Sequence, residues 1–473
     1  MNNIGLFAFG IQKSSPSSSF PVPFTAFHSP FTQFRFALAV AVLCSAVACR
    51  PGSVSPAPVA PDTASLRSDV SFLASDSLAG RGTGTAGYDS AAAYVVRRWQ
   101  LLELTPVLVR DAAACGAAGL RSACDSLYQQ PFVARSAAAA HAGVNSELPT
   151  SNVAALLRGR DPELRDQYVV IGAHLDHLGR AGGGALDPQA GNAIRNGADD
   201  NASGSAVVME LARLLAADPP RRSVMFVHFS GEELGLLGSQ YFVEHLPVPI
   251  ENVVAMINFD MVGRLREDKL IVYGVSTAEE MTRLVDSANI EPRLDLRTVA
   301  DGFGPSDHSS FYAKGVPVLH MFTDLHDEYH RATDDVETLS IAGMGRVAKY
   351  AERVARVIAD RQDRLTPVRK APPVVSSSPG SGSGAWFGSI PDMVASEEPG
   401  VRLTGVSPGS PAEQVGVRGG DVLIEFGGQA VGDLYQFTDA LRAREPGDTV
   451  RVVVRRAGQP LTFTAVLRAR DQR

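Results

Sequence analysis

Short apolar runs alternate with amphipathic segments through the middle of the chain. Runs rich in β-branched residues predict strands, and apolar residues at helical spacing predict helices between them. The predicted strands are Tyr168–Ala173, Ser223–Phe229, Val253–Phe259, Leu270–Tyr273 and Val316–Phe322, and the predicted helices are Gly204–Ala217, Leu236–His245, Ala278–Ile290 and Ile341–Arg361. Continuous apolar strands separated by helices are typical of an α/β fold, with a mostly parallel central sheet and helices on both of its faces.

Changes in composition divide the 473-residue chain into five segments. We expect a signal peptide (1–49), a Pro/Ser/Ala-rich tether (50–63), the α/β domain (64–363), a Pro/Ser/Gly linker (364–384) and a small β-rich domain (385–470). A chain of this length can form two or three domains that each bury a core.

The N-terminal segment predicts export. Phe36–Cys49 is apolar, uncharged and follows Arg35, and it is shorter than the roughly 20 residues that a membrane span needs. Ala46-Val-Ala-Cys49 fits signal peptidase cleavage after Ala-x-Ala, and it also fits a lipoprotein signal, in which Cys49 would carry the lipid. We therefore expect a periplasmic or cell-surface protein, whose only membrane contact would be a lipid anchor at Cys49.

Cysteine content and net charge bear on disulfide formation and on the class of binding partner. Export would allow Cys115 and Cys124, two of the four cysteines, to form a disulfide, and the alternative is two unpaired small apolar side chains. The net charge of -7 argues against a nucleic-acid partner bound by a basic surface.

Acidic residues and histidines stand where the predicted strands end. They are His174-Leu-Asp-His177, Asp199-Asp200, Glu232-Glu233, Asp260 and His330. The carboxyl ends of parallel strands meet at one edge of a sheet, and carboxylates crowded there need cations to neutralise them. Histidine and carboxylate ligands without a thiolate are typical of a catalytic zinc site, and a pair of metals needs one bridging carboxylate.

The motifs at these positions resemble those of the M28 family of dizinc exopeptidases, which includes aminopeptidases, glutamate carboxypeptidases and glutaminyl cyclases. They are Gly172–His177, Asn196–Gly204, Ser230–Ser239, Asn258–Met261 and Ser306-Asp-His308, followed by Tyr-His-x-x-x-Asp. The resemblance spans residues 64–361 and includes the early segment Phe72–Thr85. The glycine-rich match Gly82–Gly87 in this region follows a polar helix end instead of a strand, so we reject a dinucleotide-binding interpretation.

The resemblance implies two Zn²⁺ per chain, for which Co²⁺ or Mn²⁺ could substitute. Asp200 would bridge the ions, His174 and Asp260 would complete one site, and Glu233 and His330 would complete the other.

The resemblance also implies that Glu232 is the general base and that Asp176 holds the second nitrogen of the His174 imidazole. Phe303, Asp307 and His308 would line the substrate pocket. Some relatives carry a tyrosine where Phe303 stands, so the oxyanion would need zinc or another donor here.

Other histidines compete for the ligand positions. His326 and His330 form a His-x-x-x-His pair, although Asp327 stands where the zincin pattern has glutamate. His177 and His308 could also be ligands. Since the five implied ligands already fill two sites, we expect these two histidines to line the pocket or bond neighbours.

The C-terminal segment resembles a bacterial PDZ domain. Phe387, Gly388, Ser389 and Ile390 look like its carboxylate-binding loop, whose backbone N–H groups receive a peptide C-terminus by strand addition. The segment Ser410–Ile424 matches the central part of that family. The alternative is a rigid domain that only docks on the peptidase.

The resulting hypothesis is an exported zinc aminopeptidase that acts on peptides, with a PDZ module that binds peptide or protein C-termini. A carboxypeptidase, a glutaminyl cyclase and an inactive PDZ scaffold are the alternatives. A cyclase should lack a complete second metal shell, and a scaffold would have no chemical reason to keep Glu232 with all five ligands.

Overall fold

The computed structural model describes residues 59–107, 126–135, 147–180, 185–291, 293–368, 385–391 and, with short gaps, 400–469. The expected signal peptide with Cys49, most of the tether, and both Cys115 and Cys124 lie outside the described residues. Among the helices that are described, none has the length and hydropathy needed to cross a membrane.

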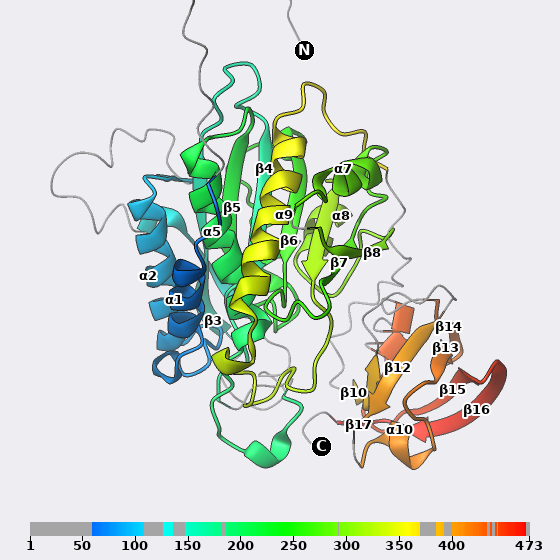
Figure 1. The fold of residues 1–473 in the computed structure, drawn as a ribbon. Helices are drawn as coiled ribbons and strands as arrows, with labels where there is room; N and C mark the ends of the chain where they lie inside the picture. Colours follow the sequence, from blue (N-terminus) through cyan, green and yellow to red (C-terminus); the bar gives the residue numbers. More distant parts are fainter. Residues whose placement is uncertain are drawn as a thin grey trace, which may run out of the picture. The chain divides into compact units, whose positions relative to one another are not determined.

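A nine-stranded sheet forms the centre of the larger domain, in the order β1-β3-β5-β4-β6-β9-β7-β8, with β2 also paired to β3 (Figure 1). The strands are β1 (Thr105–Pro106), β2 (Gln129–Arg135), β3 (Glu147–Leu157), β4 (Tyr168–His174), β5 (Ser223–Phe229), β6 (Val253–Phe259), β7 (Lys269–Tyr273), β8 (Asp295–Val299) and β9 (Val318–Phe322). The four central strands β5, β4, β6 and β9 are mutually parallel, whereas β3 and β7 join them antiparallel. The predicted α/β class is confirmed, and the sheet becomes mixed toward its edges.

Helices cover both faces of this sheet. They are α1 (Thr63–Leu73), α2 (Ala86–Leu101), α5 (Gly204–Ala217), α6 (Leu237–Glu244), α7 (Met281–Ala288), α8 (His308–Ala313) and α9 (Ile341–Ala359). Side chains alternate along each strand, so in β4 Val169 and Ile171 enter the core beneath α5 and α9, while Val170 enters the core beneath α6 and α8. Both faces are therefore buried, and only the sheet edges and loops remain for a site.

The C-terminal end of this domain extends beyond its last helix. Leu365 is buried in the same core, and the Val368 N–H donates to the Thr277 carbonyl. Residues 364–368, which were expected in the linker, therefore contact the larger domain.

The smaller domain has its own sheet, in the order β11-β12-β13-β15-β16, with β14 paired to β13 and a separate β10–β17 pair. Its elements are β10 (Ala385–Trp386), β11 (Ser389–Pro391), β12 (Val401–Val406), α10 (Pro411–Gln414), β13 (Val422–Phe426), β14 (Gln429–Ala430), β15 (Thr449–Arg456), β16 (Gln459–Val466) and β17 (Arg468–Ala469). A separate core that includes Phe387, Phe426 and Val452 holds it together. The expected small β-rich domain is present.

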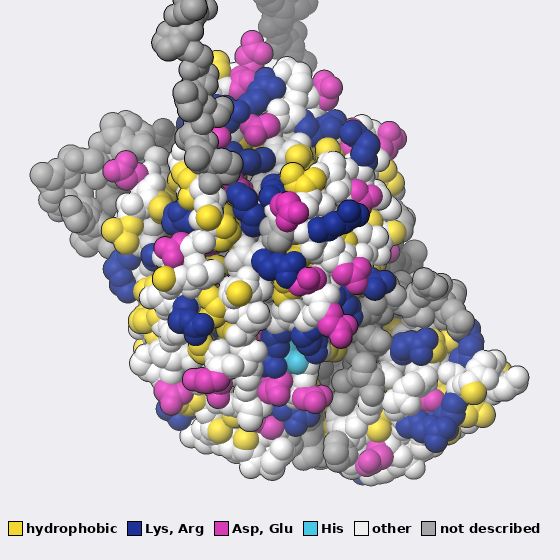
Figure 2. Space-filling view, in the orientation of Figure 1, with side chains coloured by type: hydrophobic (Ala, Val, Ile, Leu, Met, Phe, Trp, Pro, Cys, Tyr) yellow, Lys and Arg dark blue, Asp and Glu magenta, His cyan; other side chains and the backbone are white. Residues whose placement is uncertain are grey.

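Charged side chains of both signs are interspersed on the face shown in Figure 2. Lys and Arg side chains lie next to Asp and Glu over the described part of that face, as on an ordinary solvated surface.

His228 makes the stability of the larger domain depend on pH. It lies fully buried in β5, with its ring 5.4 Å from Trp99 and its Nε2 3.2 Å from the Ser205 carbonyl oxygen. Burial lowers its pKa from 6.5 to about 4. His228 therefore takes up a proton near pH 6.5 in the unfolded chain but only near pH 4 in the folded chain. As the pH falls through this window, the free energy of unfolding decreases by about 3 kcal/mol on account of this group.

Urea unfolding of the wild type and of His228→Gln, at pH 7 and pH 4.5, measures this contribution. We expect the variant to lose less stability between the two pH values than the wild type loses. Equal losses would show that His228 does not carry the effect.

Candidate metal centre

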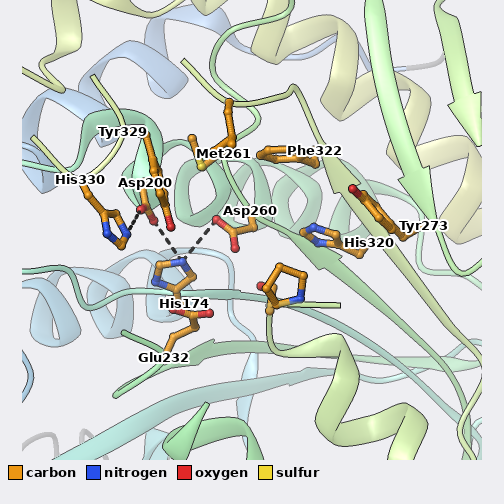
Figure 3. A pocket seen from close by; sticks show the side chains of 13 residues that line it. His174, Asp200, Glu232, Asp260, Met261, Tyr273, His320, Phe322, Tyr329 and His330 are labelled. Atoms are coloured by element: carbon orange, nitrogen blue, oxygen red, sulfur yellow. Dashed lines mark hydrogen bonds and ion pairs between the residues drawn. The ribbon is translucent and has the colours of Figure 1, made fainter. Parts of the chain in front are cut away.

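The carboxyl ends of the parallel strands bring acidic and imidazole side chains to one sheet edge. His174 is the last residue of β4, Asp260 directly follows β6, and Glu232-Glu233 follow the end of β5. Asp200 lies just before α5, and His330 lies in the loop after β9. Figure 3 shows His174, Asp200, Asp260 and His330 converging on one pocket.

The five expected ligands form two groups that share Asp200. His174 Nε2 lies 3.3 Å from Asp200 Oδ1 and 3.3 Å from Asp260 Oδ1. His330 Nε2 lies 3.1 Å from Asp200 Oδ2 and 3.2 Å from Glu233 Oε2. Ligand atoms about 2.0 Å from a tetrahedral zinc are separated by about 3.3 Å, so each of the two histidines has that spacing to both of its carboxylates. The two oxygens of Asp200 serve one group each, as a bridging carboxylate requires.

The charges at this centre depend strongly on one another. Burial alone would lower the pKa of His174 and of His330, but the surrounding carboxylates outweigh it and raise both well above the ordinary value. Burial would raise the pKa of Asp200, but His177, His174 and His330 hold it well below the ordinary value. The buried carboxylates of the centre thus depend on neighbouring positive charge, which a bound cation would supply.

Glu232 lines the pocket beside the first group, and one of its oxygens lies within 4.8 Å of the ligand atoms of His174 and Asp260. Burial, aided by Glu233 and Asp260 and opposed by His174, raises its pKa well above the ordinary value. A carboxyl group with a raised pKa next to a reaction site can both accept and release a proton, as the expected general base must.

Asp176 does not hold the His174 imidazole with its carboxylate as expected. The carboxylate lies 4.0 Å from His174 Nδ1, because the turn after β4 brings the Asp176 main-chain carbonyl to 3.1 Å from that nitrogen instead. The carboxylate accepts hydrogen bonds from the Thr83 hydroxyl at 2.8 Å and from the Glu232 N–H at 3.2 Å. Asp176 therefore fixes the loop that carries Glu232.

Two further histidines have neighbours of their own. His177 Nδ1 lies 2.7 Å from Glu233 Oε1, so this residue bonds a neighbour as expected, and it is the nearest competitor of His330 for the second group. His326 Nε2 lies 3.3 Å from Asp199 Oδ2, and His326 Nδ1 lies 3.2 Å from Glu328 Oε2. His326 is thus engaged outside both groups.

Asp334 is a site residue that sequence reasoning missed. Its carboxylate accepts the main-chain N–H groups of Asp199 and Asp200, at 3.0 to 3.1 Å, and a hydrogen bond from Arg264. It thereby fixes the backbone of the bridging carboxylate. The only sequence signal was its place as the acid of the Tyr-His-x-x-x-Asp motif.

An apolar wall adjoins the metal groups in the pocket. Besides the site residues, the pocket is lined by Met261, Tyr273, Pro305, Ser306, His320, Phe322, Leu325 and Tyr329. Asn258 orients part of this wall, since its side-chain amide donates to Ser306 Oγ at 2.8 Å and lies 3.2 Å from His320 Nδ1. Tyr329, which sequence reasoning also missed, stacks on His330 with ring centroids 3.8 Å apart.

Phe303, Asp307 and His308 do not line this pocket, contrary to expectation. The Phe303 ring packs against Tyr312, with centroids 4.7 Å apart, and the His308 ring stacks on His320 at 4.4 Å. His308 begins α8 and Asp307 is its N-cap residue, and both side chains are fully buried. Only Pro305 and Ser306 of this segment reach the pocket.

In the smaller domain, the expected carboxylate-binding loop leads into β11. The Phe387 side chain is fully buried and packs against Phe426 at 5.2 Å, so it serves the core. Gly388 has a φ of 83°, and a Cβ there would come within 2.2 Å of the Ser410 Cβ, so the turn requires glycine. Ser389 and Ile390 pair with β12 through Val406 and Gly405.

Comparison with known proteins identifies both domains. Residues 152–355 match the sequence model of peptidase family M28, and residues 391–467 match that of the PDZ domain. Aminopeptidase YwaD of Bacillus subtilis is 32% identical over 155 residues, which cover 30% of this chain and 34% of that protein. Probable leucine aminopeptidase 1 of Trichophyton verrucosum is 31% identical over 219 residues, which cover 42% of this chain and 55% of that protein.

The chain thus spans about a third of the length of the first relative and about half of the second. A solved Zn-dependent exopeptidase from Parabacteroides distasonis has the same fold, with a TM-score of 0.50 and 17% identity over 64% of this chain and 100% of that one. The sequence matches and the fold agree with the motifs at the sheet edge: residues 152–355 match peptidase family M28, and residues 391–467 match the PDZ domain.

Proposed function

We propose that the protein is a dizinc aminopeptidase that removes N-terminal residues from peptides. The observation that carries this proposal is the position of Asp200, whose two oxygens belong to two histidine–carboxylate groups of zinc spacing next to Glu232. His174 and Asp260 would hold one ion, and Glu233 and His330 would hold the other.

Zinc, when bound, would supply Lewis acidity that polarises the scissile carbonyl and acidifies a water molecule. Glu232 would take a proton from the attacking water as the C–O bond forms, and would pass it to the leaving nitrogen as the C–N bond breaks. Figure 3 shows the Tyr329 hydroxyl directed toward the group of His174, Asp200 and Asp260. We assign to that hydroxyl a hydrogen bond to the substrate carbonyl oxygen, the role for which Phe303 has no donor.

The side chains of the pocket offer no cation for a substrate C-terminus. Among the described residues that line it there is neither lysine nor arginine. A carboxypeptidase needs such a side chain to hold the substrate carboxylate, so this lining favours an aminopeptidase. Each proposed zinc would have one histidine and two carboxylates as ligands, which disfavours a cyclase with an incomplete second shell.

The apolar wall predicts which N-terminal side chains are accepted. Met261, Phe322 and Leu325 offer apolar surface, and each matched methylene contributes about 1–3 kcal/mol to discrimination. We therefore expect the kcat/KM of leucyl-nitroanilide to exceed that of glycyl- and glutamyl-nitroanilide by more than about tenfold.

A panel of aminoacyl-nitroanilides and short peptides, each with a free or an acetylated N-terminus, tests the proposal. The free forms should be hydrolysed from the N-terminus and the acetylated forms should not. Release of C-terminal residues from acetylated peptides would establish a carboxypeptidase instead. Absence of turnover with zinc bound would favour the scaffold.

The remaining parts of the proposal concern location and recruitment. We propose export on the strength of residues 36–49, and binding of peptide C-termini by the PDZ domain on the strength of the loop from Phe387 to Ile390. Such a module would hold a substrate or a partner protein near the peptidase.

A further inference from the structure

The glycine-rich segment Gly80–Thr85 has no role once the dinucleotide interpretation is rejected. It packs against the loops that carry the residues of the metal centre. Arg81 is fully buried in it, with its backbone at a φ of 49°. A long cationic side chain is seldom buried completely, since removing its charge from water is costly. The hydrogen bonds of Arg81 must therefore compensate for the burial of its charge.

All hydrogen bonds of the Arg81 guanidinium go to main-chain carbonyls of three segments. Nε donates to Leu175 at 2.9 Å, and the two terminal nitrogens donate to Asn196 at 2.7 Å and to Gly197 at 3.0 Å. A further bond reaches the carbonyl of Leu73, at the end of α1.

These carbonyls flank two of the metal ligands. Leu175 directly follows His174, and Asn196 and Gly197 lead into the turn that carries Asp200. One planar guanidinium group thus connects the exit of β4 with the turn before α5. A lysine ammonium, which offers donors from a single point, could not reproduce this fork.

The main chain of the same segment adds bonds to the β4 exit. The Arg81 carbonyl accepts the His177 N–H at 3.2 Å, and the Gly80 carbonyl accepts the Gly179 N–H at 3.0 Å. A Cβ on Gly80 would lie 2.4 Å from the Arg195 carbonyl oxygen, so this close approach requires glycine.

Thr83 extends the connection to the general base. Its hydroxyl donates to Asp176 Oδ2 at 2.8 Å, and Asp176 Oδ1 accepts the Glu232 N–H at 3.2 Å. The segment therefore contacts the loops of His174, Asp200 and Glu232, although none of its own side chains lines the pocket.

The charge of Arg81 suits this position as well. Burial lowers the pKa of Arg81 to about 10, and the charges of Asp200 and Asp176 oppose that shift, so the guanidinium stays positive at neutral pH. It places a fixed positive charge behind the carboxylates of the centre.

We propose that Arg81 is a positioning residue for the metal centre. It holds the loops of His174 and Asp200 in register, so that the Asp200 carboxylate reaches both groups. This inference rests on the proposed function only in requiring that the two groups bind zinc.

The test measures zinc affinity by competition with a chelator, together with kcat, KM and thermal stability, in full-length Arg81→Lys and Arg81→Met. Arg222 offers a matched control, because it is equally buried and also donates to main-chain carbonyls, those of Ile358 and Gln362. It directly precedes β5, whereas the metal centre lies beyond the other end of that strand. We expect the Arg81 variants to lose about 10–100-fold in zinc affinity and to lower kcat more than they raise KM. Arg222→Met should lower the melting temperature but keep wild-type zinc affinity.

Unchanged zinc affinity in folded Arg81→Lys, or an equal loss in Arg222→Met, would overturn the proposal, because Arg81 would then act only through stability. If neither Arg81 variant folds, Thr83→Val provides the second measurement. It should lower kcat by more than about tenfold with zinc content intact, and wild-type kcat would contradict the positioning role of the segment. A wild type that binds zinc but cleaves no peptide would refute the proposed function and leave the Arg81 measurement valid.

Discussion

Glu232→Gln is expected to lower kcat for leucyl-nitroanilide by about 10²- to 10⁴-fold while the zinc content stays at the wild-type level. Glutamine has nearly the size and shape of glutamate but cannot accept the proton of the attacking water. Glu232 stands next to the first metal group, where burial raises its pKa well above the ordinary value. Its loop is fixed through the main chain by Asp176, which the substitution leaves in place.

The adjacent Glu233 gives a matched control for this measurement. Its carboxylate lies 3.2 Å from His330 Nε2, and although burial opposes it, His330 helps to lower its pKa to about 2. Glu233→Gln should therefore lose zinc as well as activity. Near-normal turnover in Glu232→Gln would remove Glu232 as the base, and loss of zinc there would make it a ligand.

His330→Ala is expected to halve the zinc content and to abolish nearly all turnover. His330 Nε2 is the only imidazole nitrogen of the described residues that lies within 3.3 Å of both Asp200 Oδ2 and Glu233 Oε2, so its loss should empty the second group and spare the first. Metal analysis after gel filtration, with kcat measured on the same sample, checks this.

His326→Ala and His177→Ala decide between the competing histidines. His326 is engaged by Asp199 and Glu328, so its alanine variant should retain both zincs. His177 contacts Glu233 Oε1 at 2.7 Å, and its variant should weaken the second zinc without removing it. Full zinc in His330→Ala and half in His177→Ala would reverse the assignment of the second group.

The sequence predicts the centre of this fold well, for one physical reason. Strands β4, β5, β6 and β9 are buried on both faces and therefore appear as continuous apolar runs. Several site residues stand at or just after the ends of those runs, because the carboxyl ends of parallel strands lie at one edge of the sheet. His174, Asp260 and Glu233 come together because the parallel strands β4, β6 and β5 all end at that edge.

The edges of the sheet could not be predicted in the same way. Pairing of β3 and β7 with the parallel core is antiparallel, and this depends on tertiary contacts that the pattern does not contain. β3 mixes exposed and buried residues, because its first half lies beyond the core. Such a strand lacks a clear period.

The pocket and the orientation of single side chains also lay beyond sequence reasoning. Tyr329, Phe322 and Leu325 enter the pocket through the end of β9 and the loop after it, whose path the pattern does not set. The His308 ring stacks on His320, a tertiary contact that the pattern does not contain. For Asp176, a single turn decides that its carbonyl, and not its carboxylate, faces His174.

The most direct test of the account is a crystal structure of the zinc-loaded protein with anomalous data collected on both sides of the zinc absorption edge. The account predicts two zinc peaks on either side of the Asp200 carboxylate, one contacting His174 and Asp260 and the other contacting His330 and Glu233, about 3.5–4 Å apart. A single peak, or a second peak held by His326, would contradict it.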